Sequence, residues 1–177
     1  SDEERFPEAL RGVALEAHAA VRQAGAARPE LQGMATTLTL VMGVWPHAYV
    51  VQVGDSRCYH WSGGALHRVT RDQTMAQDLV DRGVLPENKV ETSPMSHVLS
   101  SAIGGQTAAP VVTRIALSRG SAVLLCSDGL TKHVSDAEIA EVLRSMTSSE
   151  QACRTLLQRA LDGGGTDNVT VTLGRGR

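Results

Sequence analysis

The sequence is poor in aromatic residues and carries no excess of positive charge. Aromatic side chains make up 3% of the chain, so the core must be aliphatic and a surface that stacks unpaired nucleic-acid bases is not expected. Lys and Arg number 17 against 19 Asp and Glu, which gives a formal net charge of −2. This balance excludes the basic surface that a nucleic-acid backbone requires. The aromatic residues are Phe6, Trp45, Tyr49, Tyr59 and Trp61.

Long apolar runs and paired cysteines are missing as well. No apolar run approaches the roughly 20 residues of a membrane-spanning helix, so we do not expect a membrane protein. The three cysteines, Cys58, Cys126 and Cys153, form no Cys-x-x-Cys pair. Their spacing argues against a zinc knuckle or a disulfide framework, and it favours a reducing cytoplasm. With 177 residues, 42% of them hydrophobic and 20% charged, the sequence predicts one globular domain over residues 1–177.

Hydrophobic periodicity predicts an α+β fold. Apolar residues recur at helical spacing over 1–24, and cap residues at Ser135 and Ser148 predict two further helices. We also expect a short helix over 73–82 and an exposed loop over 84–97. Alternating apolar residues predict short antiparallel strands at 38–44, 49–53, 59–61, 66–69, 111–117, 122–126 and 169–173. The simplest arrangement is a pair of sheets packed face to face with helices outside.

Three aspartates share one sequence context, because each adjoins an apolar strand inside a glycine-containing turn. They are Asp55, Asp128 and Asp167. Carboxylates at strand ends are held by rigid backbone and still reach the rim of a sheet, where oxygen ligands gather hard cations such as Mg²⁺ or Mn²⁺. Any one of these turns, taken alone, is ordinary turn chemistry. Together they indicate a metal site.

Five ordered motifs resemble those of metal-dependent PP2C-type (PPM) serine/threonine phosphatases, in their bacterial form. The resemblance extends from about residue 33 to residue 173, which is most of the chain. Five motifs in the family's order make it specific, whereas a single Gly-Asp-Ser would not. The motifs are Gly-Met-Ala-Thr-Thr (33–37), Val-Gly-Asp-Ser-Arg (53–57), His-Val-Leu to Ile-Gly-Gly (97–105), Leu-Cys-Ser-Asp-Gly-Leu (125–130) and Gly-Gly-Thr-Asp-Asn-Val-Thr-Val (164–171).

The resemblance implies a β-sandwich of two antiparallel sheets flanked by helices, and hydrolysis of phosphoserine and phosphothreonine on proteins. In the family a water that bridges two Mg²⁺ or Mn²⁺ ions is the nucleophile, so no catalytic side chain is assigned. By position, Asp128 and Asp167 correspond to metal ligands and Asp55 to a ligand of a third, weaker metal. Asn168 corresponds to a local support, and residues 74–96 to a mobile flap.

Two motifs that the family normally carries are not found in residues 1–34. One contains an Arg that binds phosphate, and the other ends in Asp-Gly-Met-Gly-Gly, whose Asp bridges both metals. Smaller departures are Ala35 in place of Gly and Gln73 in place of His. The chain therefore resembles the C-terminal two-thirds of such a phosphatase. It is a fragment of an active enzyme, a short form acting in binding or regulation, or a chain whose sheets a neighbour completes.

A different enzyme class is weighed against this interpretation. Gly54-Asp55-Ser56 is similar to the nucleophile block of GDSL-type esterases, but the Asp-x-x-His that those enzymes need does not occur in the sequence. The partners that the phosphatase resemblance implies are phosphoproteins, including a Ser/Thr kinase, with no nucleic acid and no membrane. Missing strands would leave exposed sheet edges, so we also expect self-association.

Overall fold

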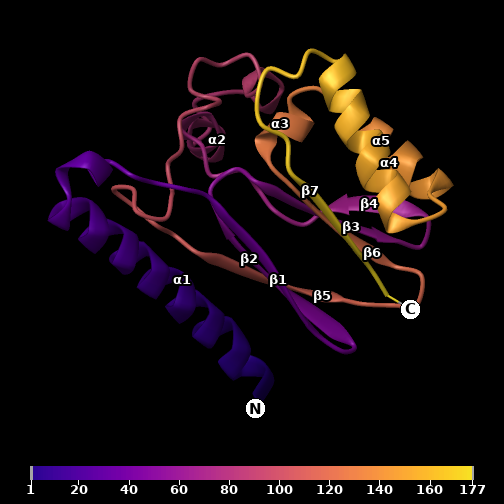
Figure 1. Cartoon of the computed structure of the whole chain (residues 1–177), viewed down its shortest axis with the longest axis horizontal. Coiled ribbons are helices and arrows are strands. Elements are labelled where there is room, and N and C mark those ends of the chain that lie inside the picture. Colours follow the sequence, from indigo (N-terminus) through magenta and orange to yellow (C-terminus); the bar gives the residue numbers. More distant parts are fainter. Residues whose placement is uncertain (1, 177) are drawn as a thin grey trace. The chain divides into compact units, whose positions relative to one another are not determined.

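The computed structural model describes the backbone of residues 2–176 and the side chains of residues 5–176. Helices and strands are mixed along the chain, which confirms the α+β class (Figure 1). No helix in this described part has the length and apolar composition of a membrane span. In chain order the elements are α1 (Asp2–Ala27), η1 (Pro29–Leu31), β1 (Leu38–Val44), β2 (His47–Val53), β3 (Arg57–Ser62), β4 (Ala65–Arg68), α2 (Met75–Asp81), η2 (Glu87–Lys89), β5 (Val111–Ala116), β6 (Ala122–Cys126), α3 (Asp128–Thr131), α4 (Asp136–Ser145), α5 (Ser149–Asp162) and β7 (Val171–Arg175).

The chain divides into two compact units, each assembled from separate segments. The first holds the residues up to Met42, Tyr49–Asp55 and Arg71–Arg114, and the second holds Gly43–Ala48, Ser56–Thr70 and the residues from Ile115 onward. A three-stranded sheet of order β1-β2-β5 belongs mainly to the first unit. A four-stranded sheet of order β4-β3-β6-β7 lies wholly in the second. Whether residues 1–177 act as one domain stays a prediction.

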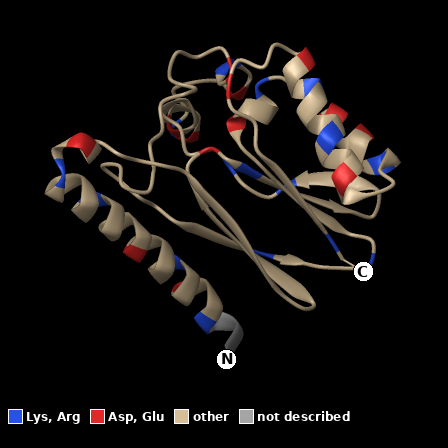
Figure 2. Cartoon of the chain, in the orientation of Figure 1, with Lys and Arg blue, Asp and Glu red and all other residues tan. Residues whose placement is uncertain are grey.

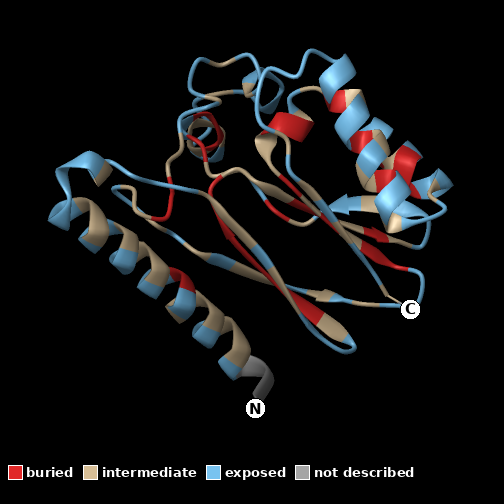
Figure 3. Cartoon of the chain, viewed as in Figure 1, coloured by how far each residue is buried: buried red, intermediate tan, exposed pale blue. Residues whose placement is uncertain are grey.

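In the first unit, helix α1 packs on the sheet through aromatic and small residues. The ring centroids of Phe6 and Tyr49 lie 5.6 Å apart, and Ala14 is buried. Most of α1 is intermediate or exposed (Figure 3). Tyr49 belongs to β2, which is buried along its last six residues. The helix also holds the loop before β5, because Nδ1 of His18 accepts the backbone N–H of Gly104 at 3.0 Å.

In the second unit, α4 and α5 supply the apolar side chains that cover one face of the four-stranded sheet. The sheet is antiparallel, with Tyr59 opposite Leu124 and Leu124 opposite Leu173. Ile139 of α4 and Leu156 of α5 are fully buried in the same cluster. Burial of one such side chain contributes about 1.5–3 kcal/mol. The outer faces of these helices carry charges of both signs (Figure 2).

Both predicted helix caps of the second unit are present. The Ser135 hydroxyl accepts the backbone N–H of Glu138, while the Glu138 carboxylate accepts the backbone N–H of Ser135. This capping box holds the pKa of Glu138 below its ordinary value. Ser148 caps α5 by accepting the N–H of Gln151 at 3.0 Å. Helix α4 is also tied to the sheet, because the Tyr59 hydroxyl donates to Asp136 at 2.7 Å.

Several predicted boundaries differ from the structure by one to three residues, and two of them have a clear local cause. Helix α1 continues through Gly25 to Ala27 instead of ending near residue 24. Glycine within a helix costs only about 1 kcal/mol, and the helix stops before Pro29, which disfavours helical backbone in the residue preceding it. Strand β7 begins at Val171 instead of residue 169, because Thr170 forms its backbone hydrogen bonds with Ser127 instead.

Candidate functional site

Asp128 and Asp167 lie at adjoining ends of two neighbouring strands. Asp128 follows β6 after Ser127, and Asp167 precedes β7. The two strands pair antiparallel with Cys126 opposite Val171. The segment that leaves β6 and the segment that enters β7 therefore meet at the same end of the sheet. This pairing brings together two of the three carboxylates that the sequence predicts as metal ligands.

Hydrogen bonds of Ser127 fasten these two loops to each other. Its hydroxyl donates to the carbonyl oxygen of Asn168 at 3.2 Å and accepts the backbone N–H of Thr170 at 3.0 Å. Its backbone N–H donates to the carbonyl oxygen of Thr170 at 3.1 Å. Asn168 donates its own backbone N–H to the Asp167 carboxylate at 2.8 Å. Backbone contacts of Asn168 thus help to set the position of Asp167 relative to Asp128.

Gly129 is required by the close approach of the two loops. A Cβ at this position would lie 2.2 Å from the carbonyl oxygen of Asn168, well inside van der Waals contact. Sequence reasoning places Asp128 and Gly129 in a turn, whereas the structure places them in the single-turn helix α3. The glycine therefore serves close packing between the loops.

The two carboxylates converge on Lys132, the residue directly after α3. Its Nζ lies 2.7 Å from Oδ2 of Asp128 and 2.5 Å from Oδ2 of Asp167. Hydrogen bonds to Asp128 first, and to Asp167 second, raise the pKa of Lys132 above its ordinary value. Sequence reasoning missed this lysine. The signal was its four-residue spacing from Asp128, which puts the two side chains on one helix face.

This donor set fits a hard divalent cation. Two carboxylates from separate loops already surround one positive charge, and carboxylate oxygens are the ligands that Mg²⁺ and Mn²⁺ favour. Among the described residues, no group of three or more His, Cys, Asp or Glu side chains gathers in a metal-binding arrangement. Asp128 and Asp167 therefore fit one side of a metal site and leave further ligand positions to other groups.

A second contact fixes the loop that carries Asp167. Nε2 of His133 and the hydroxyl of Thr166 are 2.8 Å apart. The glycine run after α5 packs closely against His133. A Cβ on Gly163, the first residue of this run, would lie 2.9 Å from the Cβ of His133. The predicted stop of α5 at this run is confirmed, with Gly163 as the C-cap. Asp167 is thus held from both sides of its loop.

Asp55 belongs to the first unit, where it follows β2. The preceding Gly54 has φ +104°, and a Cβ there would lie 2.5 Å from the methyl group of Thr37, so only glycine fits. Gln73 donates its backbone N–H to the carbonyl of Gly54 and accepts the Gly54 N–H on its side chain at 2.8 Å. Gln52 donates to the same carbonyl at 3.0 Å. The turn that presents Asp55 is therefore fixed by two buried or part-buried amides.

The predicted flap, residues 74–96, contains α2 and η2. Thr74 caps α2 by accepting the backbone N–H of Gln77 at 3.3 Å, and it forms an isolated β-bridge with Leu99. Met75 and Met95 are exposed, at 41% and 45%. The segment is thus anchored at Thr74 and apolar on part of its surface. Its role as a flap stays a prediction.

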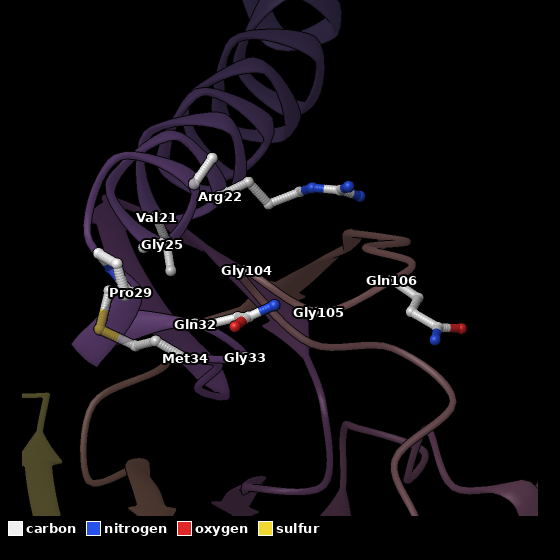
Figure 4. Close-up of a pocket in the computed structure, with 11 residues that line it drawn as sticks. Val21, Arg22, Gly25, Pro29, Gln32, Gly33, Met34, Gly104, Gly105 and Gln106 are labelled. Atoms are coloured by element: carbon white, nitrogen blue, oxygen red, sulfur yellow. The ribbon is translucent and has the colours of Figure 1, made fainter.

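A separate pocket of about 540 Å³ lies in the first unit, between the end of α1 and the loop before β5 (Figure 4). Arg22, Gln32 and Gln106 are among the side chains around it, together with several glycines. None of its described lining residues is Asp, Glu, His or Cys. This pocket therefore contains none of the predicted metal ligands.

A family model described as protein phosphatase 2C matches residues 2–163. The chain belongs to the protein phosphatase 2C family. Membership confirms the resemblance that the five motifs indicate. A solved phosphatase that the chain resembles, the catalytic domain of PstP, holds two manganese ions.

Relatives with names and structures agree with this membership. Serine/threonine protein phosphatase PstP of Mycobacterium tuberculosis is 39% identical over 145 residues, which are 82% of this chain and 28% of that protein. The catalytic domain of PstP, solved in complex with two manganese ions, gives a TM-score of 0.78 at 35% identity and covers 88% of this chain and 65% of that chain. The S. agalactiae serine/threonine phosphatase gives 0.89 at 27% identity, with 96% and 70% covered. The predicted PP2C-like fold is confirmed, and the chain spans only part of each relative.

Proposed function

We propose that this chain is part of a metal-dependent phosphatase that hydrolyses phosphoserine and phosphothreonine on proteins. Asp128 and Asp167 hold one side of its metal centre, and Asp55 is a ligand of a third, weaker metal. The observation that carries this proposal is the convergence of two carboxylates on a single cation position, at 2.7 and 2.5 Å, in a chain of the PP2C family. When bound, two Mg²⁺ or Mn²⁺ ions supply a water of lowered pKa and a positive clamp on the phosphoryl group.

Residues of this chain position the two carboxylates that would hold the metal. Asp128 and Asp167 orient their carboxylates toward one point, because Ser127 and Gly129 hold the two loops in contact. The charge that develops on phosphorus needs such preorganised partners, since a site that must rearrange loses part of its electrostatic stabilisation. A phosphate-binding side chain is not assigned among the 177 residues.

The test is Mn²⁺-dependent hydrolysis of p-nitrophenyl phosphate by the 177-residue chain, with EDTA as control and with the mass of the intact chain confirmed. Turnover should disappear in Asp128→Ala and in Asp167→Ala. It should persist in Asp162→Ala, which removes a carboxylate at the end of α5 that accepts a hydrogen bond from Gln158. Activity that survives in both site variants would contradict the proposal.

A second candidate function is a catalytically incomplete module that acts in binding or regulation. It is favoured by the pair of acidic groups at the site, since no larger ligand group gathers within the described residues. The same assay shows whether the chain is active by itself. Turnover by the chain alone supports the enzyme, whereas Mn²⁺ binding without turnover supports the module, or an enzyme whose remaining ligands come from elsewhere.

Partners and location follow from the same proposal. The substrates are phosphoproteins, with a Ser/Thr kinase among them. The edges of the two sheets, β1, β5, β4 and β7 by strand order, offer surfaces for self-association. The thiols of Cys58, Cys126 and Cys153 suit a reducing cytoplasm.

A further inference from the structure

We propose that Lys132 competes with the divalent cation for Asp128 and Asp167, and that its side chain leaves the site when the cation binds. This inference rests on the function proposed above, because it concerns access to the same metal site. The Lys132 ammonium thus acts as a competing cation that is part of the chain. It raises the concentration of Mg²⁺ or Mn²⁺ that is needed to occupy the site.

The geometry forces a choice between the two cations. The Lys132 ammonium takes Oδ2 of Asp128 and Oδ2 of Asp167 at once. A divalent ion held by the same pair of oxygens would stand close to where Nζ now lies, since Mg²⁺ binds oxygen at about 2.0–2.1 Å. Two positive centres so close repel each other strongly. Lysine and metal therefore cannot both be held by these two oxygens.

The Lys132 side chain can move into solvent while its backbone stays in place. Its backbone is fixed by the hydrogen bond from its N–H to the carbonyl of Asp128 at 2.9 Å, so only the four-carbon stem needs to move. The side chain is 27% exposed, and the two carboxylates are 34% and 42% exposed. A path to solvent is therefore open, and an ammonium regains full hydration once it reaches water.

In the metal-free chain, Lys132 reduces the repulsion between Asp128 and Asp167. Ser127 and Gly129 hold the loops of Asp128 and Asp167 together, which forces two negative charges into proximity. An ammonium between them offsets this repulsion. The exchange of lysine for a divalent ion changes the charge of the cluster from −1 to 0, if both aspartates are ionised.

The sequence offers a direct measurement, because the chain contains two lysines, Lys89 and Lys132. We suggest acetylation by an N-hydroxysuccinimide ester with and without saturating Mn²⁺, followed by mass spectrometry of the peptides. Acetylation of Lys132 should rise severalfold with Mn²⁺, because its side chain leaves the two carboxylates for solvent, where its neutral amine form can attack the ester. Lys89, on η2, is the internal reference and should not change. A rate at Lys132 that stays constant or falls with Mn²⁺ overturns the inference.

Calorimetric titration with Mn²⁺ supplies an independent measurement. Lys132→Met keeps the length of the stem and removes the competing charge, so Mn²⁺ should bind about fivefold more tightly than in the unmodified chain. Lys89→Met is the matched control and should bind Mn²⁺ as the unmodified chain does. Equal or weaker binding by Lys132→Met overturns the inference.

Failure of the inference can be told apart from failure of the proposed function. If Mn²⁺ binds neither to the unmodified chain nor to Lys132→Met, the metal site itself is refuted and the inference falls with it. If Asp128→Asn and Asp167→Asn abolish Mn²⁺ binding, but Lys132 shows no change in acetylation and no effect on affinity, only the inference is overturned.

Discussion

The carbonyl oxygen of Asn168 occupies the space in which a side chain at Gly129 would lie, at 2.2 Å from the Cβ position. Gly129 lies in helix α3, after β6, and Asn168 lies in the loop before β7. Their contact explains why glycine follows Asp128 and shows how closely the two loops approach. The position of the predicted metal ligands thus depends on a residue that has no side chain.

Gly129→Ala should lower the free energy of unfolding and weaken Mn²⁺ binding, because the added methyl group must push the loop of Asn168 away. Overpacking of this kind costs about 1–3 kcal/mol. Urea denaturation and calorimetric titration measure the two effects. Gly174→Ala is the control, since a Cβ there meets nothing within 4 Å. Equal stability of the two variants would refute the packing role of Gly129.

Ser127→Ala should have a similar effect by a different route. The substitution removes the hydroxyl that donates to Asn168 and accepts from Thr170. Loss of these hydrogen bonds is expected to cost about 1–2 kcal/mol, and Mn²⁺ affinity should fall because the loops separate. Hydrogen exchange at the amide of Thr170 reports the lost bond directly. An unchanged exchange rate would show that the hydroxyl does not fasten the loops.

Gln73→Leu should destabilise the turn before Asp55. The leucine keeps the approximate volume of the side chain, but it can neither accept the N–H of Gly54 nor donate to the carbonyl of Ala109, which Gln73 does at 2.8 Å in each case. A loss of about 1–3 kcal/mol is expected in urea denaturation. Gln106→Leu, at an exposed position, should cost much less. A cost equal to that of the control contradicts this role.

Asp55→Ala should separate two kinds of metal site. If Asp55 holds a third and weaker metal, its removal should lower kcat for p-nitrophenyl phosphate while Mn²⁺ still binds at Asp128 and Asp167. Steady-state kinetics and calorimetry, performed on the same preparation, measure both. Loss of all Mn²⁺ binding in Asp55→Ala would show that the predicted division of roles is wrong.

Because the Cys58 thiol is buried, we expect the folded chain to lose stability in alkaline solution. Burial, and secondly the neighbouring Cys126, raises the pKa of Cys58 from 9.0 to about 12. The unfolded chain therefore loses this proton first, so the stabilising contribution is complete below pH 9.0 and disappears as the pH rises toward about 12. Urea denaturation at increasing pH should show a steeper decline for the unmodified chain than for Cys58→Ala. Parallel declines would contradict the burial effect.

The strand and helix pattern could be predicted because these features are local, whereas the role of the three aspartates as metal ligands stays a prediction. Ser135 and Ser148 mark helix starts within four residues of sequence, and Asp128 is separated from an apolar strand by Ser127 alone. Lys132 could not be predicted as a partner of Asp167, since the two are 35 residues apart. A lysine beside a turn is usually a solvated charge. Only the pairing of β6 with β7 makes this lysine a neighbour of both carboxylates.

Gln73 illustrates the same limit in the first unit. Its departure from the family's histidine is visible in the sequence, yet its partners are backbone groups of Gly54 and Ala109, 19 and 36 residues away. Backbone groups have no residue-specific signature, so no motif identifies them. Side chains that bind distant backbone are therefore the part of a site that sequence patterns reveal least.

The ion pair between Lys132 and Asp167 closes a loop that contains the whole of α4 and α5. Any cation that joins Asp128 to Asp167 closes the same loop, and it does so reversibly. A cation that binds this folded pair and not the unfolded chain stabilises the closed loop by mass action. Divalent ions should therefore slow the opening of both helices, so the metal concentration that serves the chemistry also adjusts the rigidity of the entire helical layer.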